Sequence, residues 1–241
     1  MKRYFQQFLL LSLLLTANHA WSGAFSVTPV RIFFEPRDRA VAITLNNEGD
    51  EEVALQADIH SWVQDSKGTD QLELTEDLIV SPPSLKIAPR SKQVVRLALV
   101  TPRDPSRQMT YRLIVREVPE ATAPKQGEIQ LPIALVLSMP VFITPPGAKR
   151  QIECAVVMSA ANALETQCEN KGNAYAQLRS MELKRGDNVL ATFDGVMYIL
   201  PGSNKSVPVK TVDGPRPSSG PAQLSLMFDD GKPQTLSVHI P

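Results

Sequence analysis

The sequence is poor in the residues that carry catalysis and metal binding. Of its 241 residues only three are histidine and two are cysteine. It contains no G-x-S-x-G elbow, no phosphate-binding glycine loop, no H-E-x-x-H and no C-x-x-C motif. Asp229 and Asp230 form an acidic pair, but strand-like stretches flank them, so a turn between paired strands explains them better than a metal site. We therefore predict a non-enzymatic protein without a metal ion or cofactor.

Net charge and long apolar segments are also missing. The 25 Lys+Arg balance the 25 Asp+Glu, which excludes a highly charged disordered chain and a basic nucleic-acid binder. Glycine is scarce, with 12 residues against 20 prolines, and this proline content favours strands and turns over helices. Beyond the N-terminal region, no segment is apolar over the ~20 residues that a spanning helix needs. We expect a mature chain that is not embedded in a membrane and does not bind nucleic acid.

The N-terminus has the three parts of a secretory signal peptide. Lys2 and Arg3 supply positive charge, residues 8–15 form a short apolar run, and small residues follow up to Ala20 or Ala24. The apolar run is too short to anchor the chain in a bilayer. We predict that residues 1–24 are a signal peptide cleaved after Ala20 or Ala24, and that the mature protein enters an oxidising compartment.

Two cysteines remain in that compartment, and each lies in a strand-like stretch. Cys154 is in residues 151–158 and Cys168 is in residues 165–169. A catalytic or metal-binding pair is the alternative, but no histidine lies nearby and the spacing matches no ligand pattern. A disulfide between Cys154 and Cys168 is the simpler interpretation.

The mature chain reads as a succession of short strands separated by turns, about ten residues apart. This spacing is typical of an all-β sandwich. Residues 144–148 hold two prolines and a glycine, which cannot continue a sheet ladder. We therefore predict an all-β protein of two immunoglobulin-like β-sandwich domains, residues 25–145 and residues 146–241.

The stretch before this boundary has an unusual row of apolar side chains. Six occupy every second position, so all of them point to one face of an extended strand: Ile129, Leu131, Ile133, Leu135, Leu137 and Met139. An ordinary terminal strand that covers its own core would show the same pattern. A strand near 15 residues, however, exceeds the usual length of 3 to 10. Part of the row could therefore project beyond the sandwich and serve a partner.

Several ordered motifs give the chain a resemblance to the periplasmic pilus-assembly chaperones of the PapD type. The resemblance covers nearly the whole mature chain, and the form of its last motif is more like the branch called archaic. The motifs are FSVTPVR at 25–31, PPSLKIAP at 82–89, QVVRL at 93–97, YRLIVREVP at 111–119, IAL at 133–135 and PVFITP at 140–145.

The resemblance implies a boomerang of two immunoglobulin-like domains that holds a pilus or fimbrial subunit in its cleft. The chaperone would donate its long edge strand to complete the subunit, as in donor-strand complementation, and would pass the subunit to an outer-membrane usher. The implied donor row is Leu131, Ile133 and Leu135, with Ile129 and Leu137 as extensions. Arg31 matches the arginine that binds the subunit's C-terminal carboxylate.

The chain also departs from the PapD-type pattern. Pro140 stands where that pattern has a second, lysine anchor, so the second basic anchor is not placed. Cys154 and Cys168 do not match the C-terminal disulfide of the PapD-type member used for comparison, so that bond rests on spacing alone. An exposed donor row is also consistent with self-capping in a homo-oligomer.

Two other classes of function stay open from the sequence. One is a secreted structural or adhesive β-sandwich protein, such as a pilus subunit, which should be a single incomplete domain with an apolar N-terminal extension. The other is a periplasmic hydrolase on a β-sandwich scaffold, which the shortage of histidine and of catalytic motifs disfavours.

Overall fold

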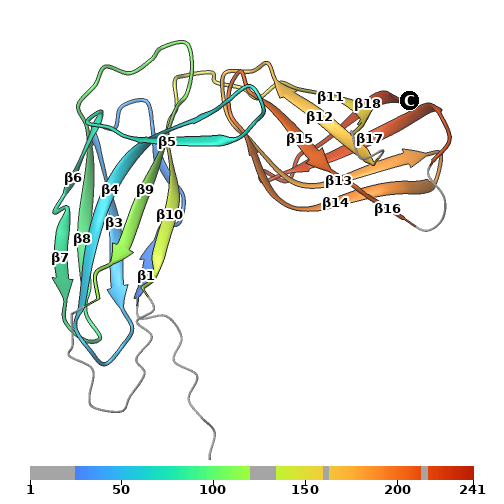
Figure 1. Cartoon of the computed structure of the whole chain (residues 1–241). Helices are drawn as coiled ribbons and strands as arrows, with labels where there is room; N and C mark the ends of the chain where they lie inside the picture. The colour runs from blue at the N-terminus through green and yellow to red at the C-terminus, as the bar shows by residue number, and fades with distance from the viewer. Residues whose placement is uncertain (1–24, 120–133, 160–162, 213–216) are drawn as a thin grey trace, which may run out of the picture.

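The computed structural model describes residues 25–119, 134–159, 163–212 and 217–241. These residues form strands and turns, and no helix occurs among them. None of them forms a helix long and apolar enough to cross a membrane. Figure 1 shows two units of strands joined at an angle, which gives the chain a boomerang shape. The predicted all-β architecture of two sandwiches is confirmed.

The first unit packs two sheets around one core. One sheet has the order β1-β3-β8-β6, and the other has the order β2-β10-β9-β4-β5, with β7 paired to β4. The strands are β1 (Phe25–Thr28), β2 (Ile32–Phe34), β3 (Ala40–Asn47), β4 (Val53–Gln64), β5 (Asp70–Leu74), β6 (Leu78–Ser81), β7 (Ser84–Ile87), β8 (Lys92–Leu99), β9 (Met109–Glu117) and β10 (Val136–Ile143).

Alternation along β9 shows why these stretches form half-buried strands. Tyr111, Leu113 and Val115 are buried in the core, at 3%, 0% and 0% exposure. The intervening Arg112 and Ile114 point to the opposite face of the sheet. The sequence therefore gives this sheet one core face and one outer face.

The chain changes sheets close to the start of its described residues. β1 pairs antiparallel with β3, whereas β2 pairs in parallel with β10 in the other sheet. Pro29 lies in the connection, where it donates no ladder hydrogen bond. Arg31 directly precedes β2, so it lies at the point where the chain joins the second sheet.

The second unit is also a two-sheet sandwich with its own core. Its sheets have the orders β11-β12-β15 and β16-β14-β13-β17-β18. The strands are β11 (Ile152–Met158), β12 (Leu164–Asn170), β13 (Ala176–Arg185), β14 (Asn188–Ile199), β15 (Asn204–Pro208), β16 (Lys210–Thr211), β17 (Gly220–Phe228) and β18 (Pro233–Ile240). Asp229 and Asp230 lie in the turn between β17 and β18, as the sequence predicts.

Each unit has a buried asparagine that joins backbone segments. The amide of Asn47 donates to the carbonyls of Ile87 and Glu51, at 2.9 and 2.7 Å. The amide of Asn170 donates to the carbonyls of Ala174 and Ile199, at 2.8 and 3.0 Å. Both asparagines are at most 2% exposed, so their hydrogen bonds are not replaced by water.

Candidate functional site

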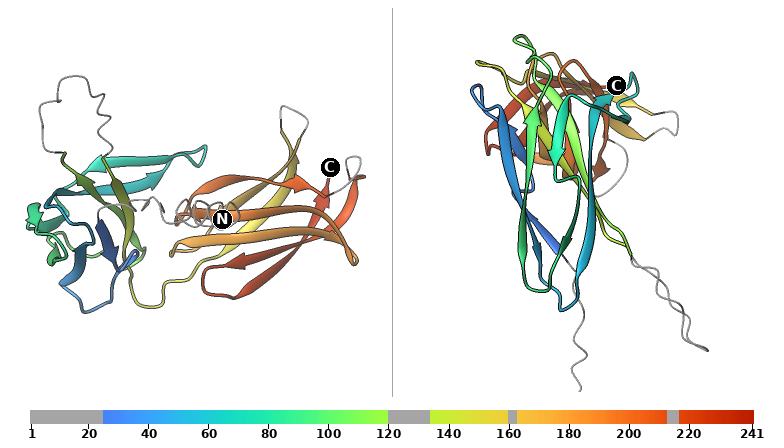
Figure 2. Two further views of the ribbon diagram at one scale, coloured as in Figure 1. Left: turned by 90° about the horizontal axis from the view of Figure 1, so that it is seen from below. Right: turned by 90° about the vertical axis from the view of Figure 1, so that its left-hand side faces the viewer.

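The outer face of the β2-β10-β9-β4-β5 sheet meets the second unit at the elbow of the boomerang. Figure 2 shows the β4–β5 hairpin of the first unit reaching toward the second. Trp62, Phe142 and Leu200 form a separate buried cluster there, and Tyr175 and Tyr198 pack against it. Two of the five residues come from the first unit and three from the second, so this cluster is the apolar seam between the units.

Aromatic rings make most of the contacts in this seam. The ring of Phe142 stacks on Tyr175, with centroids 4.0 Å apart and planes inclined by 9°. Trp62 meets Tyr198 edge-on at 5.2 Å. Phe33, which is more than a third exposed, stacks on Phe142 at 5.4 Å. Such pairs contribute beyond their buried area, so the elbow is a packed joint.

Two glutamine side chains bind the backbone of the second unit across this joint. Gln64 donates to the Tyr198 carbonyl at 3.0 Å and accepts from the Leu200 N–H at 3.0 Å. The side-chain oxygen of Gln108, which is 4% exposed, accepts from the Tyr175 N–H at 2.8 Å, and the backbone N–H of Gln108 donates to the Asn173 carbonyl at 2.9 Å. These reciprocal bonds fix the two units in one orientation.

Arg31, the predicted carboxylate anchor, lies at this elbow and contacts the second unit. Its Nη1 donates to Asp229 Oδ2 at 2.5 Å and to Gln177 Oε1 at 3.0 Å. The Tyr175 hydroxyl donates to the same Asp229 oxygen at 3.0 Å. Burial lowers the pKa of Arg31, but the hydrogen bond to Asp229 and the nearby negative charge outweigh it and raise the pKa overall. Arg31 is therefore a fixed cation.

Tyr175 is kept as a hydrogen-bond donor by its surroundings. Burial, the charge of Asp229 and the hydrogen bond to it together raise the pKa of the Tyr175 hydroxyl. The hydroxyl therefore stays protonated at neutral pH and continues to donate to Asp229.

A second arginine, which the sequence reasoning did not single out, also lies on the elbow face. The Arg112 guanidinium stacks over the Trp62 ring, 3.7 Å from its centroid, and lies 5.4 Å from the Tyr198 ring. Burial is the main cause that lowers its pKa. In the described residues it has no hydrogen-bond or ion-pair partner. In the sequence, Arg112 could have been found as a charged residue between two apolar positions of a strand.

The described residues of this region begin at Ala134, and β10 begins at Val136. Ile129, Leu131 and Ile133 lie outside the described residues. Leu135 and Leu137 are partly buried and pack against the first core, on the same face as the buried Met139. Over this part, the apolar row covers the chain's own core, as an ordinary terminal strand would.

β10 has an open backbone edge over part of its length. On one side it pairs with β9 from Val136 to Ile143. On the other side β2 pairs only with Val141, Phe142 and Ile143. Among the described strands, nothing pairs with this side from Val136 to Pro140, and Pro140 has no N–H to offer there. A stretch of unpaired strand edge can accept a further strand.

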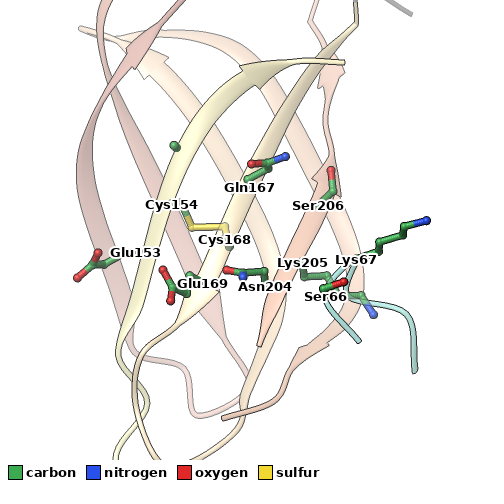
Figure 3. Close-up of a pocket in the computed structure, with 11 residues that line it drawn as sticks. Ser66, Lys67, Glu153, Cys154, Gln167, Cys168, Glu169, Asn204, Lys205 and Ser206 are labelled. Carbon is green, nitrogen blue, oxygen red and sulfur yellow. A yellow bond between two sulfur atoms is a disulfide. The ribbon is translucent and has the colours of Figure 1, made fainter. Parts of the chain in front are cut away.

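The predicted disulfide is present in the second unit. Cys154 and Cys168 face each other in the β11–β12 pair, with Cα atoms 4.1 Å apart. Figure 3 shows the bond in the wall of a cavity of about 490 Å³, which the β4–β5 hairpin borders with Ser66 and Lys67.

Charged side chains that line this cavity form ion pairs with neighbouring residues. Glu153 is ion-paired with Lys171, and Glu169 lies 4.0 Å from the same ammonium group. Lys205 pairs with Asp70 of β5 at 3.3 Å. Of these pairs only Lys205–Asp70 crosses between the units, so one ion pair links the units beside the cavity.

Comparisons with known proteins agree with this architecture. A family model described as "Pili and flagellar-assembly chaperone, PapD N-terminal domain" matches residues 24–149. The chain belongs to this family. Its members are chaperones, which confirms the resemblance drawn from the motifs.

Two fimbrial or related chaperones are about a quarter identical to the chain over the regions that match. "Chaperone protein LpfB" of Salmonella typhimurium is 25% identical over 142 residues, which is 58% of this chain and 57% of that protein. "Probable fimbrial chaperone LpfB" of Escherichia coli O157:H7 is 26% identical over 148 residues, 61% of this chain and 60% of that protein. The matches therefore span about three fifths of each relative's length.

Solved structures of this family have the same fold over nearly the whole chain. A chain of the CsuC-CsuE chaperone–tip adhesion subunit complex, from the archaic chaperone-usher Csu pili of Acinetobacter baumannii, has a TM-score of 0.65 at 21% identity. The match covers 90% of this chain and 98% of that one. The YadV chaperone has a TM-score of 0.63 at 17% identity, covering 90% of this chain and 100% of that one. At these identities the comparison establishes the fold alone.

Proposed function

We propose that this chain is a periplasmic, ATP-independent and non-enzymatic chaperone that binds and caps pilus subunits and delivers them to an outer-membrane usher. The observation that carries the proposal is the open edge of β10 from Val136 to Pro140, beside a rigid elbow, in a chain of the PapD family. Two sandwiches, each with its own core, support this function over that of a pilus subunit, for which we expect a single incomplete domain.

The proposed mechanism is strand donation. A subunit strand would add to the open edge of β10 by backbone hydrogen bonds, and the row Leu131, Ile133 and Leu135 would enter the subunit's apolar groove, with Ile129 and Leu137 as extensions. If three such side chains leave water at roughly 1.5–3 kcal/mol each, the upper bound is about 9 kcal/mol before ordering costs. Without a subunit, the same edge is open to a second copy of the chain, so we expect the free protein to self-associate.

Arg31 would bind the C-terminal carboxylate of the subunit. A guanidinium and a carboxylate form a bidentate, charge-assisted pair, which fixes register as well as adding energy. Hydrogen bonds to charged groups contribute about 1.5–3 kcal/mol. Arg31→Ala should therefore weaken subunit binding by about 10-fold to 100-fold.

The test is capture of subunits in the periplasm by the tagged chain, quantified by mass spectrometry. We expect Ile133→Asp to abolish capture, because it places a charge in the apolar row. The matched control is Ala134→Asp, the next residue along, which is exposed and stands outside the alternating apolar row, and it should capture as the wild type does. Undiminished capture by Ile133→Asp would contradict strand donation.

A second pair of variants tests the anchor. Arg31→Ala should lose subunit, whereas Arg116→Ala should not, because Arg116 is an exposed arginine of β9 that pairs with Asp58 of its own unit at 3.2 Å. Equal loss in both variants would mean that general positive charge, rather than a fixed anchor, attracts the subunit.

A further inference from the structure

The second unit holds the proposed anchor through two direct hydrogen bonds and a third that supports one of them. Asp229 lies in the turn after β17, and Gln177 and Tyr175 lie at and just before the start of β13. They are 198, 146 and 144 positions from Arg31, respectively, and all three belong to one hydrogen-bonded group with it. The second domain therefore orients the side chain that would bind the subunit's carboxylate.

The three guanidinium nitrogens of Arg31 differ in whether they have hydrogen-bond partners. Nη1 carries two hydrogens, and its two acceptors are Asp229 Oδ2 and Gln177 Oε1. Within the described residues, Nη2 and Nε of Arg31 have no hydrogen-bond partner. A carboxylate can bind a guanidinium end-on, through Nη1 and Nη2, or side-on, through Nε and Nη2. In Arg31 the end-on pair of donors is half occupied, whereas the side-on pair is open to a carboxylate.

Arg31 lies where a strand added to the open edge of β10 would end. The open edge of β10 stops at Pro140, because Val141 is already paired with Ile32 of β2. A strand added along this edge must end where β2 begins, and Arg31 directly precedes Ile32. A positive group at that place fits a terminal carboxylate, which the added strand presents when it runs parallel to β10 in line with β2.

We propose that Asp229, supported by Gln177 and Tyr175, is a positioning residue that aims the Nε/Nη2 side of Arg31 at the C-terminal carboxylate of the bound subunit. This inference rests on the proposed role of Arg31 as a carboxylate anchor. It gives the second domain a role in recognising the subunit that requires no direct contact between this domain and the subunit.

Asp229 acts on a bound carboxylate in two opposite ways, which two substitutions separate. Its negative charge repels the incoming carboxylate, and its hydrogen bond holds the guanidinium in place. Asp229→Asn removes the charge and keeps an oxygen that accepts from Nη1, whereas Asp229→Ala removes both. Positioning therefore predicts that Asp229→Asn binds a carboxylate at least as well as the wild type, and that Asp229→Ala binds about tenfold more weakly than Asp229→Asn.

The experiment uses the purified protein with ¹⁵N-labelled arginine and follows the Nε–H resonance of Arg31, assigned by its loss in Arg31→Lys. The probes are N-acetylglycine, which ends in a peptide-like carboxylate, and N-acetylglycinamide, which does not. We expect a saturable shift with the acid alone, and the predicted order of affinities among the Asp229 variants. Asp230→Ala is the matched control, since Asp230 is the next residue and pairs with Arg150. An unchanged one-dimensional proton resonance of the Trp62 indole N–H shows that a variant keeps the elbow.

The outcomes distinguish failure of the positioning role of Asp229 from failure of the anchor role of Arg31. Equal affinity of Asp229→Ala and Asp229→Asn for N-acetylglycine overturns positioning while leaving the anchor intact. The absence of any acid-specific shift in the wild type overturns the anchor and the inference together. Capture of subunits in the periplasm tests the chaperone function separately, because it depends on β10 as well as on Arg31.

Discussion

Replacing Phe142 by alanine should loosen the joint between the two domains. Phe142 is 0% exposed, and its ring stacks on Tyr175 of the second domain at 4.0 Å. Removing a buried phenylalanine side chain typically costs 3–5 kcal/mol, so we expect a loss of about 4 kcal/mol in the free energy of unfolding. With a urea dependence of about 2 kcal/mol per molar, the midpoint should fall by about 2 M.

Trp62 fluorescence is the natural assay for this change. Trp62 is buried in the same seam, and the other tryptophan, Trp21, is absent from a chain that begins at Phe25, which is the chain to use here. The control is Phe33→Ala, because Phe33 contacts the same rings but is 38% exposed; its midpoint should fall by only about 0.5 M. A shift below 0.5 M for Phe142→Ala, or equal shifts for the two variants, would refute the view of the elbow as a packed joint.

Three further predictions concern the second domain. Replacing Cys154 and Cys168 by serine should cost about 3 kcal/mol of stability, since the bond closes a loop with a sequence separation of 14; circular dichroism during urea unfolding measures this, and no change would contradict it. Asn170→Ala should cost about 3 kcal/mol, because two buried carbonyls lose their donor; a cost under 1 kcal/mol in the same assay would argue against that role. The hydrogen bond from Arg150 lowers the pKa of Asp230 below its unfolded value of about 3.9. Its stabilisation, at most about 1 kcal/mol, is therefore complete above that value and lost as the pH falls through the folded pKa. Asp230→Asn should accordingly be less stable than the wild type at pH 7, and the difference should shrink as the pH falls below about 3.9; a constant difference would refute the assignment.

The elements that rest on local sequence could be predicted. Period-two alternation places Tyr111, Leu113 and Val115 in the core, and the strand-like surroundings of Cys154 and Cys168 indicate their pairing. Each of these features is fixed by the sterics of an extended strand or by one pair of neighbouring strands.

The elbow could not be predicted in the same way. Its seam joins Trp62 and Phe142 to Leu200, residues far apart in the sequence that no periodic pattern connects. The ion pair between Arg31 and Asp229 spans 198 positions, and the sequence reasoning interpreted Asp229 only as part of a turn. Such contacts depend on how two finished domains dock, which strand patterns do not encode.

The role of the donor row could be predicted from the sequence only in part. The pattern gives the face of each side chain, and Leu135 and Leu137 share a face with the buried Met139. The use of that row by a partner is a property of two molecules, so it remains a prediction for Ile129, Leu131 and Ile133, which lie outside the described residues.

The most direct measurement is to isolate the tagged chain from a periplasm in which fibres are being made, and to identify by mass spectrometry what accompanies it. The account predicts a stoichiometric small protein with an N-terminal alternating apolar segment, which is lost on Ile133→Asp and on Arg31→Ala and retained on Ala134→Asp. Isolation of the chain alone under those conditions, or capture that is indifferent to all three substitutions, would contradict it.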